Sequence, residues 1–164
     1  GARSDRTPLN CGGRWPSIRC SEPRRVAAAL YRGGARLNSW LAVLFVGLGG
    51  FLGAAARYGL SLAFGGLSIV IPYGTLVANV LGCFVIGVVL GLAVQTDAVS
   101  PGARLFLATG FCGGFTTMSS FVYELASLAR AGDFAIAGLY FSITLVGSIA
   151  FFYVGTLLVQ LLRA

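Results

Sequence analysis

The chain of 164 residues is 57% hydrophobic and only 10% charged, and its mean hydropathy is +0.85. A soluble domain normally carries about a quarter charged residues, so most of this surface is not expected to face water. The sequence has no His, the commonest metal ligand and neutral-pH acid–base group. It also offers no nucleophile–base pair, phosphate-binding loop or cluster of metal ligands, so an enzyme is not expected.

Residues 1–37 are rich in Arg, Gly, Pro and Ser and show no sustained periodicity. They hold eight arginines against Asp5 and Glu22, a net charge of +6, whereas residues 38–164 hold four arginines against three acids, a net charge of +1. We treat residues 1–37 as a disordered basic N-terminal extension. An extended or misassigned start, a cytosolic tail and an organellar transit peptide all remain open. A folded basic face for nucleic acid is not indicated.

Residues 38–164 fall into four apolar blocks, at about 40–64, 69–95, 105–128 and 134–162. Each reaches the roughly 20 residues that a helix needs to cross the hydrocarbon core of a bilayer. The alternation of a β-barrel is absent, and only helices and closed barrels satisfy backbone polar groups in lipid. We therefore predict an all-α membrane protein of four transmembrane helices, in which short connections make neighbouring helices antiparallel.

Glycines four residues apart recur in three of these blocks. The pairs are Gly49 with Gly53, Gly87 with Gly91, and Gly110 with Gly114. This spacing places small residues on one helix face and lets two backbones approach closely. We predict tight helix packing at these positions.

In the second block, Thr75 and Asn79 are four residues apart and share a helix face. Asn79 lies about ten residues into the block, near the expected middle of the membrane, and its amide offers two donor hydrogens. Polar groups in a membrane usually face a cavity or a partner helix. Pore lining and an interhelical hydrogen bond are both open interpretations.

The third block contains the least helical stretch, residues 113–121 (GGFTTMSSF), in which paired glycines precede four hydroxyl residues. Such a composition favours a broken helix, and broken helices at membrane depth occur where the backbone is buried or lines a site. Freed carbonyls can hold a small hard cation such as sodium. The alternative is a packed kink of the kind that Gly/Ser pairs produce.

The fourth block carries a stripe of hydroxyl groups on an otherwise apolar helix, formed by Tyr140, Thr144 and Ser148 at intervals of four residues. Three such groups on one face indicate a hydrated path, although a single Ser or Thr usually bonds back to its own helix. Glu124 is the only acid within a block and lies near the block's end. Hydroxyl and amide donors with so few acids favour an anion over a cation.

The four cysteines indicate little about function. The four cysteines, at positions 11, 20, 83 and 112, form no CxxC pair, so no disulfide framework is expected. Cys83 and Cys112 lie in apolar blocks and are interpreted as small buried hydrophobes.

The arginines of residues 38–164 show little orientational bias. Arg104 and Arg163 fall on one side of the predicted bundle, and Arg57 and Arg130 on the other. Because cytoplasmic loops normally carry an excess of Lys and Arg, a chain without bias can insert both ways and form an antiparallel dimer. If residues 1–37 are present, their arginines would hold the N-terminus inside.

Residues 38–164 resemble the bacterial fluoride channels called Fluc or CrcB. Four motifs carry the resemblance: residues 49–58 (GGFLGAAARY), residues 72–82 (PYGTLVANVLG), residues 110–121 (GFCGGFTTMSSF) and the stripe of hydroxyl groups in the fourth block. The third is similar to the family signature GFxGGFTTFSTF and is highly specific.

The resemblance implies a third helix broken in mid-membrane and a dual-topology antiparallel homodimer in the bacterial plasma (inner) membrane. It also implies two pores that export cytoplasmic fluoride passively. A central structural sodium ion would be held by the backbone carbonyls of Gly113 and Thr116, and Arg57 would lie at the vestibule. The implied fluoride pore comprises Asn79, Phe121, Met118, Thr75, Tyr140, Thr144, Ser148 and Ser120.

One position departs from the family pattern. The family places two phenylalanines three residues apart with their ring edges toward fluoride, but here Met118 precedes Phe121. A ring edge is electropositive, and a thioether has no comparable edge. Two alternatives to a homodimeric channel therefore stay open. One is a non-conducting subunit of a heterodimer; the other is a small multidrug-type exporter, which would need a glutamate in the first block that this chain lacks.

Overall fold

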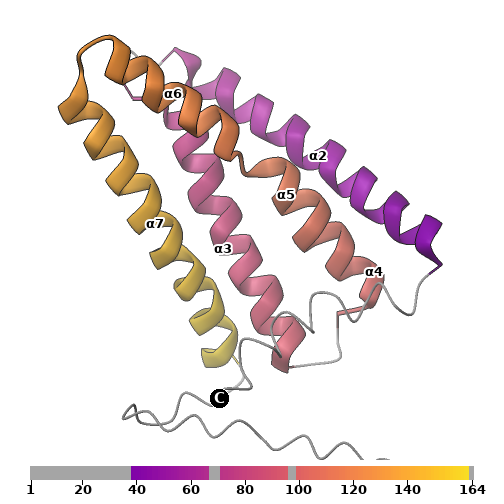
Figure 1. The fold of residues 1–164 in the computed structure, drawn as a ribbon. Coiled ribbons are helices and arrows are strands. Elements are labelled where there is room, and N and C mark those ends of the chain that lie inside the picture. The colour runs from indigo at the N-terminus through magenta and orange to yellow at the C-terminus, as the bar shows by residue number, and fades with distance from the viewer. Residues whose placement is uncertain (1–37, 67–70, 96–98, 163–164) are drawn as a thin grey trace, which may run out of the picture.

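The computed structural model describes residues 38–66, 71–95 and 99–162, and these form helices and short connections without strands (Figure 1). The predicted extension at residues 1–37 lies outside the described residues. In chain order the elements are α2 (Ser39–Gly65), α3 (Tyr73–Gln95), α4 (Pro101–Arg104), the π-helical segment η2 (Leu105–Cys112), α5 (Gly113–Phe115), α6 (Met118–Arg130) and α7 (Phe134–Leu161). Among the described residues, four stretches are long and apolar enough to cross a membrane, and the third is Pro101–Arg130 taken as a whole. The predicted four-helix membrane architecture is confirmed at this level.

Helix boundaries depart from the apolar blocks where local signals override hydropathy. Helix α3 begins at Tyr73, directly after Pro72, and not near residue 69; residues 69 and 70 lie outside the described residues. The third span begins at Pro101, four residues before the predicted start, because the Ser100 side chain accepts the N–H of Ala103 at 3.2 Å and caps the helix. Proline is well suited to the first helical position.

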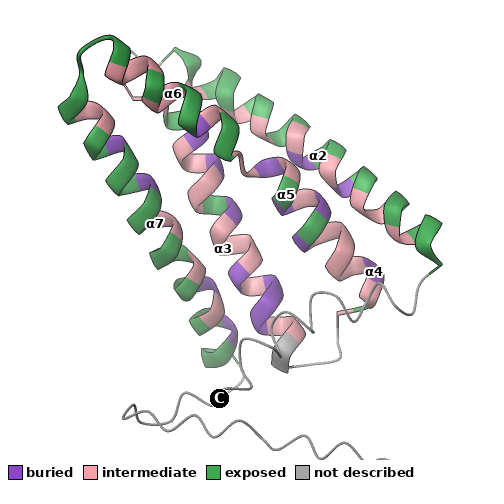
Figure 2. Cartoon of the chain, viewed as in Figure 1, coloured by how far each residue is buried: buried purple, intermediate pink, exposed green. Residues whose placement is uncertain are grey.

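The four spans lie side by side in the order α7, α3, η2 with α5, and α2, and α6 crosses back toward α7 (Figure 1). Helix α3 is the most enclosed of the spans. Of the residues in its most apolar 18-residue stretch, 44% are buried, against 11% in α2 and 17% in α7. Exposed positions follow the outer faces of α2 and α7 (Figure 2). These faces carry large apolar side chains such as Trp40 and Leu161, which is the pattern of a surface in contact with lipid.

Glycine makes the contact between α2 and the third span possible. A Cβ on Gly53 would lie 2.2 Å from the carbonyl oxygen of Phe111, and one on Gly114 would lie 2.3 Å from the carbonyl oxygen of Gly50. Both obstacles are backbone atoms, which cannot rotate away. The close approach predicted from the paired glycines of α2 and the third span is confirmed.

The contact between α3 and α7 is built in the same way. A Cβ on Gly87 would lie 2.3 Å from the carbonyl oxygen of Phe152, and one on Gly155 would lie 2.5 Å from that of Phe84. At Gly91 the nearest atom is the Cβ of Val159, at 3.1 Å. The predicted packing role of Gly87 and Gly91 is therefore confirmed. Helix α7 contributes Gly155, which the search for glycines four residues apart did not identify.

Two residues between α5 and α6 leave the helical conformation. Thr116 has φ −80° and ψ 151°, and Thr117 has φ −147° and ψ 116°. The Thr117 side chain then accepts the N–H of Ser120 at 3.3 Å and caps the start of α6. We call Thr116 and Thr117 the interruption. Both neighbouring segments are helical up to its edges.

Candidate functional site

A carboxylate and two hydroxyl groups from three different helices meet near the start of α3. The Thr75 hydroxyl donates to Oε1 of Glu124 at 2.7 Å, and the Tyr140 hydroxyl donates to Oε2 at 2.7 Å. Tyr140 is 0% exposed and Thr75 is buried. Both bonds have the ordinary length for a hydroxyl donor. We call these three residues the carboxylate cluster.

Sequence reasoning selected two members of this cluster and missed the third. Thr75 and Tyr140 were predicted to line a pore, but Glu124 was set aside because it lies near the end of its block. The sequence could have identified Glu124, because it is the only acid within an apolar block and an ionisable residue within a membrane span is a functional candidate. Its pairing with residues 49 and 16 positions away could not be read from any local spacing.

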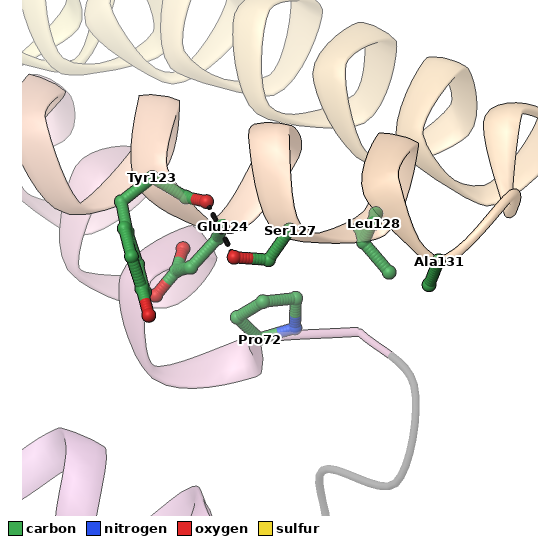
Figure 3. Close-up of a pocket in the computed structure, with 6 residues that line it drawn as sticks. All are labelled: Pro72, Tyr123, Glu124, Ser127, Leu128 and Ala131. Atoms are coloured by element: carbon green, nitrogen blue, oxygen red, sulfur yellow. Dashed lines mark hydrogen bonds between the residues drawn. The ribbon is translucent and has the colours of Figure 1, made fainter.

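The Glu124 side chain also borders an open pocket of about 260 Å³ between α6 and Pro72, the residue before α3 (Figure 3). The pocket is lined by Pro72, Tyr123, Glu124, Ser127, Leu128 and Ala131. Ser127 donates to the carbonyl oxygen of Tyr123 at 2.9 Å, so this hydroxyl is engaged within α6. Glu124 therefore stands between an open pocket and the buried hydroxyl groups of Thr75 and Tyr140.

The Asn79 amide is bound to the interruption. Its Oδ1 accepts the backbone N–H of Thr117 at 2.8 Å, and its Nδ2 donates to the Thr117 carbonyl oxygen at 3.4 Å. Of the two interpretations open for Asn79, the interhelical hydrogen bond is present. An amide nitrogen carries two hydrogens, and this bond uses one, so pore lining stays compatible with the geometry.

The interruption changes the partners of the two carbonyls predicted to hold sodium. In a continuous helix the N–H groups of Thr117 and Ser120 would bond to the carbonyls of Gly113 and Thr116. Here the Thr117 N–H goes to Asn79 and the Ser120 N–H goes to the Thr117 hydroxyl. Gly113 is exposed, and a Cβ built on it meets nothing within 4 Å. Both carbonyls thus lack their usual helical donor.

Of the three other third-span residues predicted to line the pore, Phe121 is buried and Met118 is 71% exposed. The Phe121 ring meets Tyr140 in an edge arrangement, with centroids 5.1 Å apart and planes at 62°, and stacks on Phe141 at 6.1 Å. The Ser120 hydroxyl accepts from the Thr117 hydroxyl at 3.2 Å. Phe121 therefore contacts the carboxylate cluster through Tyr140, whereas Met118 lies at the surface of the single chain.

The predicted stripe of hydroxyl groups on α7 points into the bundle. Tyr140 and Thr144 are buried, and Ser148 is half-buried. Thr144 is only 5% exposed, and its hydroxyl has no hydrogen-bond partner among the residues that the structure describes. A buried hydroxyl without a partner costs free energy, and such a group in a native fold calls for an explanation.

Arg57, predicted to lie at a vestibule, is half-buried on α2 and faces the third span. Its Nε donates to the carbonyl oxygen of Gly114 at 3.3 Å. The guanidinium therefore lies beside the C-terminal end of the helical segment before the interruption, where a positive charge is favourable. The structure thus groups Asn79 and Arg57 around the interruption, and Thr75 and Tyr140 around Glu124.

Comparison with known proteins places this geometry in a family. The family model described as "CrcB-like protein, Camphor Resistance (CrcB)" matches residues 44–156. A relative from Chlorobium luteolum named "Fluoride-specific ion channel FluC" is 50% identical over 119 residues, covering 73% of this chain and 92% of the relative. Proteins of the same name from Prosthecochloris aestuarii and Leptospira interrogans are 46% and 37% identical, over 93% and 98% of their lengths. The matched residues include both the interruption and the carboxylate cluster.

Proposed function

This chain belongs to the CrcB-like family, and we propose that it forms a fluoride-specific ion channel in the bacterial plasma membrane. The observation that carries the proposal is its identity of up to 50% with proteins named as fluoride-specific ion channels, over almost their whole length. These relatives are named as channels and not as enzymes, in agreement with the sequence. Hydrogen fluoride enters cells as a neutral acid and dissociates inside, so a passive channel lets the trapped anion leave.

The donor groups of the site support an anion path. Fluoride is small and strongly hydrated, so a narrow pore must replace its water with well-placed donors. Thr75, Asn79, Tyr140, Thr144 and Ser148 supply such groups, and the unpartnered Thr144 hydroxyl has the chemistry to bind an anion. We propose that these groups bind fluoride in succession along α3 and α7.

Glu124 would act in this path as a tethered competitor. Its carboxylate holds the hydroxyl hydrogens of Thr75 and Tyr140, the same donors that a passing anion would use. Two negative charges cannot share these donors at little cost. We propose that the carboxylate turns toward the pocket on α6 when fluoride occupies the cluster.

A second copy would complete the site. Gly113, Met118 and Ser119 are exposed around the interruption, although this stretch belongs to a span of the membrane. Exposed polar backbone at membrane depth requires a protein partner. We propose that an antiparallel second copy covers it, which agrees with the even distribution of arginines over the two sides.

A sodium ion fits the same place. The carbonyls of Gly113 and Thr116 have lost their usual helical donors, and hard cations prefer oxygen ligands. Two copies would supply four such carbonyls in a central site, where the ion would hold the two interruptions together. Arg57, on the opposite side of the third span, would add positive charge that attracts the anion toward the pore.

The test is fluoride efflux from liposomes containing the purified chain, followed with a fluoride electrode after addition of a potassium ionophore. We expect fast fluoride release while chloride is retained. No release from correctly folded dimers would refute the homodimeric channel and favour a non-conducting subunit of a heterodimer. Met118, which stands where the family has a phenylalanine, is the residue on which this alternative rests. A small multidrug-type exporter would instead show proton-driven uptake of an organic cation without fluoride release.

A further inference from the structure

The open pocket between α6 and Pro72 has room for a ligand of its own (Figure 3). Its volume of about 260 Å³ accommodates a small organic molecule of roughly ten non-hydrogen atoms. Most of its lining is apolar, and the side chain of Glu124 borders it on the side of the carboxylate cluster. The pocket therefore combines an apolar surface with a single carboxylate.

The charges around the pocket exclude an anion and favour a cation. Glu124 is the only charged side chain that lines it among the described residues, and residues 58–71, which lead to Pro72, contain no Lys or Arg. The Ser127 hydroxyl donates to the carbonyl oxygen of Tyr123 within α6, so its hydrogen is not offered to a ligand. An anion would meet a like charge here, whereas a cation would meet its counter-charge.

The Glu124 carboxylate keeps acceptor capacity for a ligand. One of its oxygens accepts from Thr75 and the other from Tyr140, each at 2.7 Å, whereas an ionised carboxylate has about four acceptor positions. Thr75 lies in the first turn of α3, where the positive end of a helix favours a negative charge. A ligand in the pocket can therefore donate to Glu124 while both bonds of the carboxylate cluster stay in place.

Two further features of the pocket attract a positive charge. The Tyr123 ring lines the pocket together with Glu124 (Figure 3), and cations are attracted to the face of an aromatic ring. The pocket also reaches Ala131, the first residue after α6, so it adjoins the negative end of that helix. We propose that the pocket binds a small organic molecule with one ammonium group, which contacts Glu124 while its apolar part lies against Pro72 and Leu128.

Every contact that supports this site lies within a single chain, so the site does not depend on fluoride conduction. Ammonium groups occur on free organic amines and on the headgroups of ethanolamine lipids, and an open pocket on a membrane-spanning chain is accessible to both. The chemistry that Glu124 and Tyr123 recognise is the same in the two cases. The two sources are distinguished by experiment.

The experiment measures binding of 2-phenylethylammonium, a free amine of about the size of the pocket, to the full chain purified in lipid-free detergent micelles. Ligand-observed NMR with saturation transfer, corrected for empty micelles, gives a dissociation constant that is expected to be about 1 mM for a ligand of this size. The matched compound is 2-phenylethanol, which has a similar shape and no charge. Charge-assisted hydrogen bonds are roughly twice as strong as neutral ones, so the amine is expected to bind about 5-fold more tightly. Equal binding of the two compounds, or no binding of the amine, would overturn the proposal.

Variants locate the bound amine. Ser127→Phe fills the pocket without changing Glu124 and is expected to abolish binding. Ser142→Phe is the matched control, because the Ser142 hydroxyl also donates within its own helix, to the carbonyl oxygen of Gly138 at 2.8 Å, and does not line the pocket. Tyr123→Leu, at an exposed position, is expected to weaken binding by about 3-fold through loss of the ring, whereas Tyr123→Phe keeps it. Unchanged binding to a folded Ser127→Phe protein, or to Tyr123→Leu if Ser127→Phe does not fold, would overturn the proposal.

Lipids added to the micelles identify the source of the ammonium group. Displacement of the amine by phosphatidylethanolamine but not by phosphatidylglycerol would assign the pocket to the lipid headgroup, and the absence of displacement by either would assign it to free amines. Equal displacement by both lipids would mean that acyl chains fill the pocket, which would overturn the proposal. Binding is measured without an ion gradient, so a failure of fluoride efflux leaves the result for this site unchanged.

Discussion

Replacing Thr144 with valine separates a role in folding from a role in conduction. Threonine and valine have nearly the same shape, so Thr144→Val removes the hydroxyl and leaves the packing of α7 in place. Thr144 is only 5% exposed, and its hydroxyl has no hydrogen-bond partner among the described residues. Such a group calls for an explanation, and the proposed ion path supplies one that can be tested.

Thr144→Val is expected to raise the stability of the protein and to lower its rate of fluoride efflux. A buried hydroxyl without a hydrogen bond costs about 1–3 kcal/mol, so its removal is expected to raise the free energy of unfolding by about 1 kcal/mol. A hydrogen bond to a charged partner is worth about 1.5–3 kcal/mol. If Thr144 donates to fluoride during conduction, its loss is expected to slow efflux by about 10–100-fold.

The assay measures unfolding in mixed micelles and fluoride efflux from liposomes on the same preparations. Thr156→Val is the matched control, because the Thr156 hydroxyl donates to the Tyr153 carbonyl oxygen at 2.8 Å on the same helix. In this control the free energy of unfolding is expected to fall by at most about 1 kcal/mol, and the rate of fluoride efflux is expected to stay the same. A Thr144→Val protein that is less stable and conducts normally would refute the assignment of this hydroxyl to the ion path.

Three further changes test the rest of the site. Glu124→Gln leaves one carbonyl acceptor for the two donors, Thr75 and Tyr140, and is expected to lower the free energy of unfolding by about 1–3 kcal/mol; unchanged stability in micelles would contradict the cluster. Met118→Phe, at a position that is 71% exposed, is expected to alter stability by no more than about 0.5 kcal/mol and to speed fluoride efflux, whereas an unchanged rate would mean that the missing ring is not limiting. Gly53→Ala places a Cβ 2.2 Å from a backbone oxygen, whereas the Cβ of Gly59→Ala meets nothing within 4 Å. The first variant is therefore expected to have a free energy of unfolding about 1–3 kcal/mol lower than the second. Equal values would refute the close packing of α2.

The fold was largely predictable because its main determinants are local and physical. Four apolar blocks of sufficient length define the spans, and lipid permits little besides helices. The paired glycines identified two helix contacts because close approach of backbones needs small residues at regular spacing. Helix starts were less predictable, since α3 begins after Pro72 and the third span at Pro101, where proline and a capping serine act against smooth hydropathy.

The site was predictable only in part, because its residues meet through long-range contacts. The inward face of α7 followed from the regular spacing of Tyr140, Thr144 and Ser148. The partner of Thr75 and Tyr140 did not, since Glu124 comes from a third helix and sits near the end of an apolar block. Similarly, the sequence marked Asn79 as polar and central but could not show that Thr117 is its partner.

The interruption shows why residues of this kind appear functional and structural at once. Leaving the helical conformation at Thr116 and Thr117 frees backbone groups that lipid cannot satisfy. Asn79 on α3 takes the Thr117 N–H on one side, and Arg57 on α2 donates to the Gly114 carbonyl on the other. These polar side chains allow an irregular backbone to exist at this depth. If the proposed ion path runs through this region, it depends on these side chains twice, because they shape the backbone around it and also place a donor or a charge beside it.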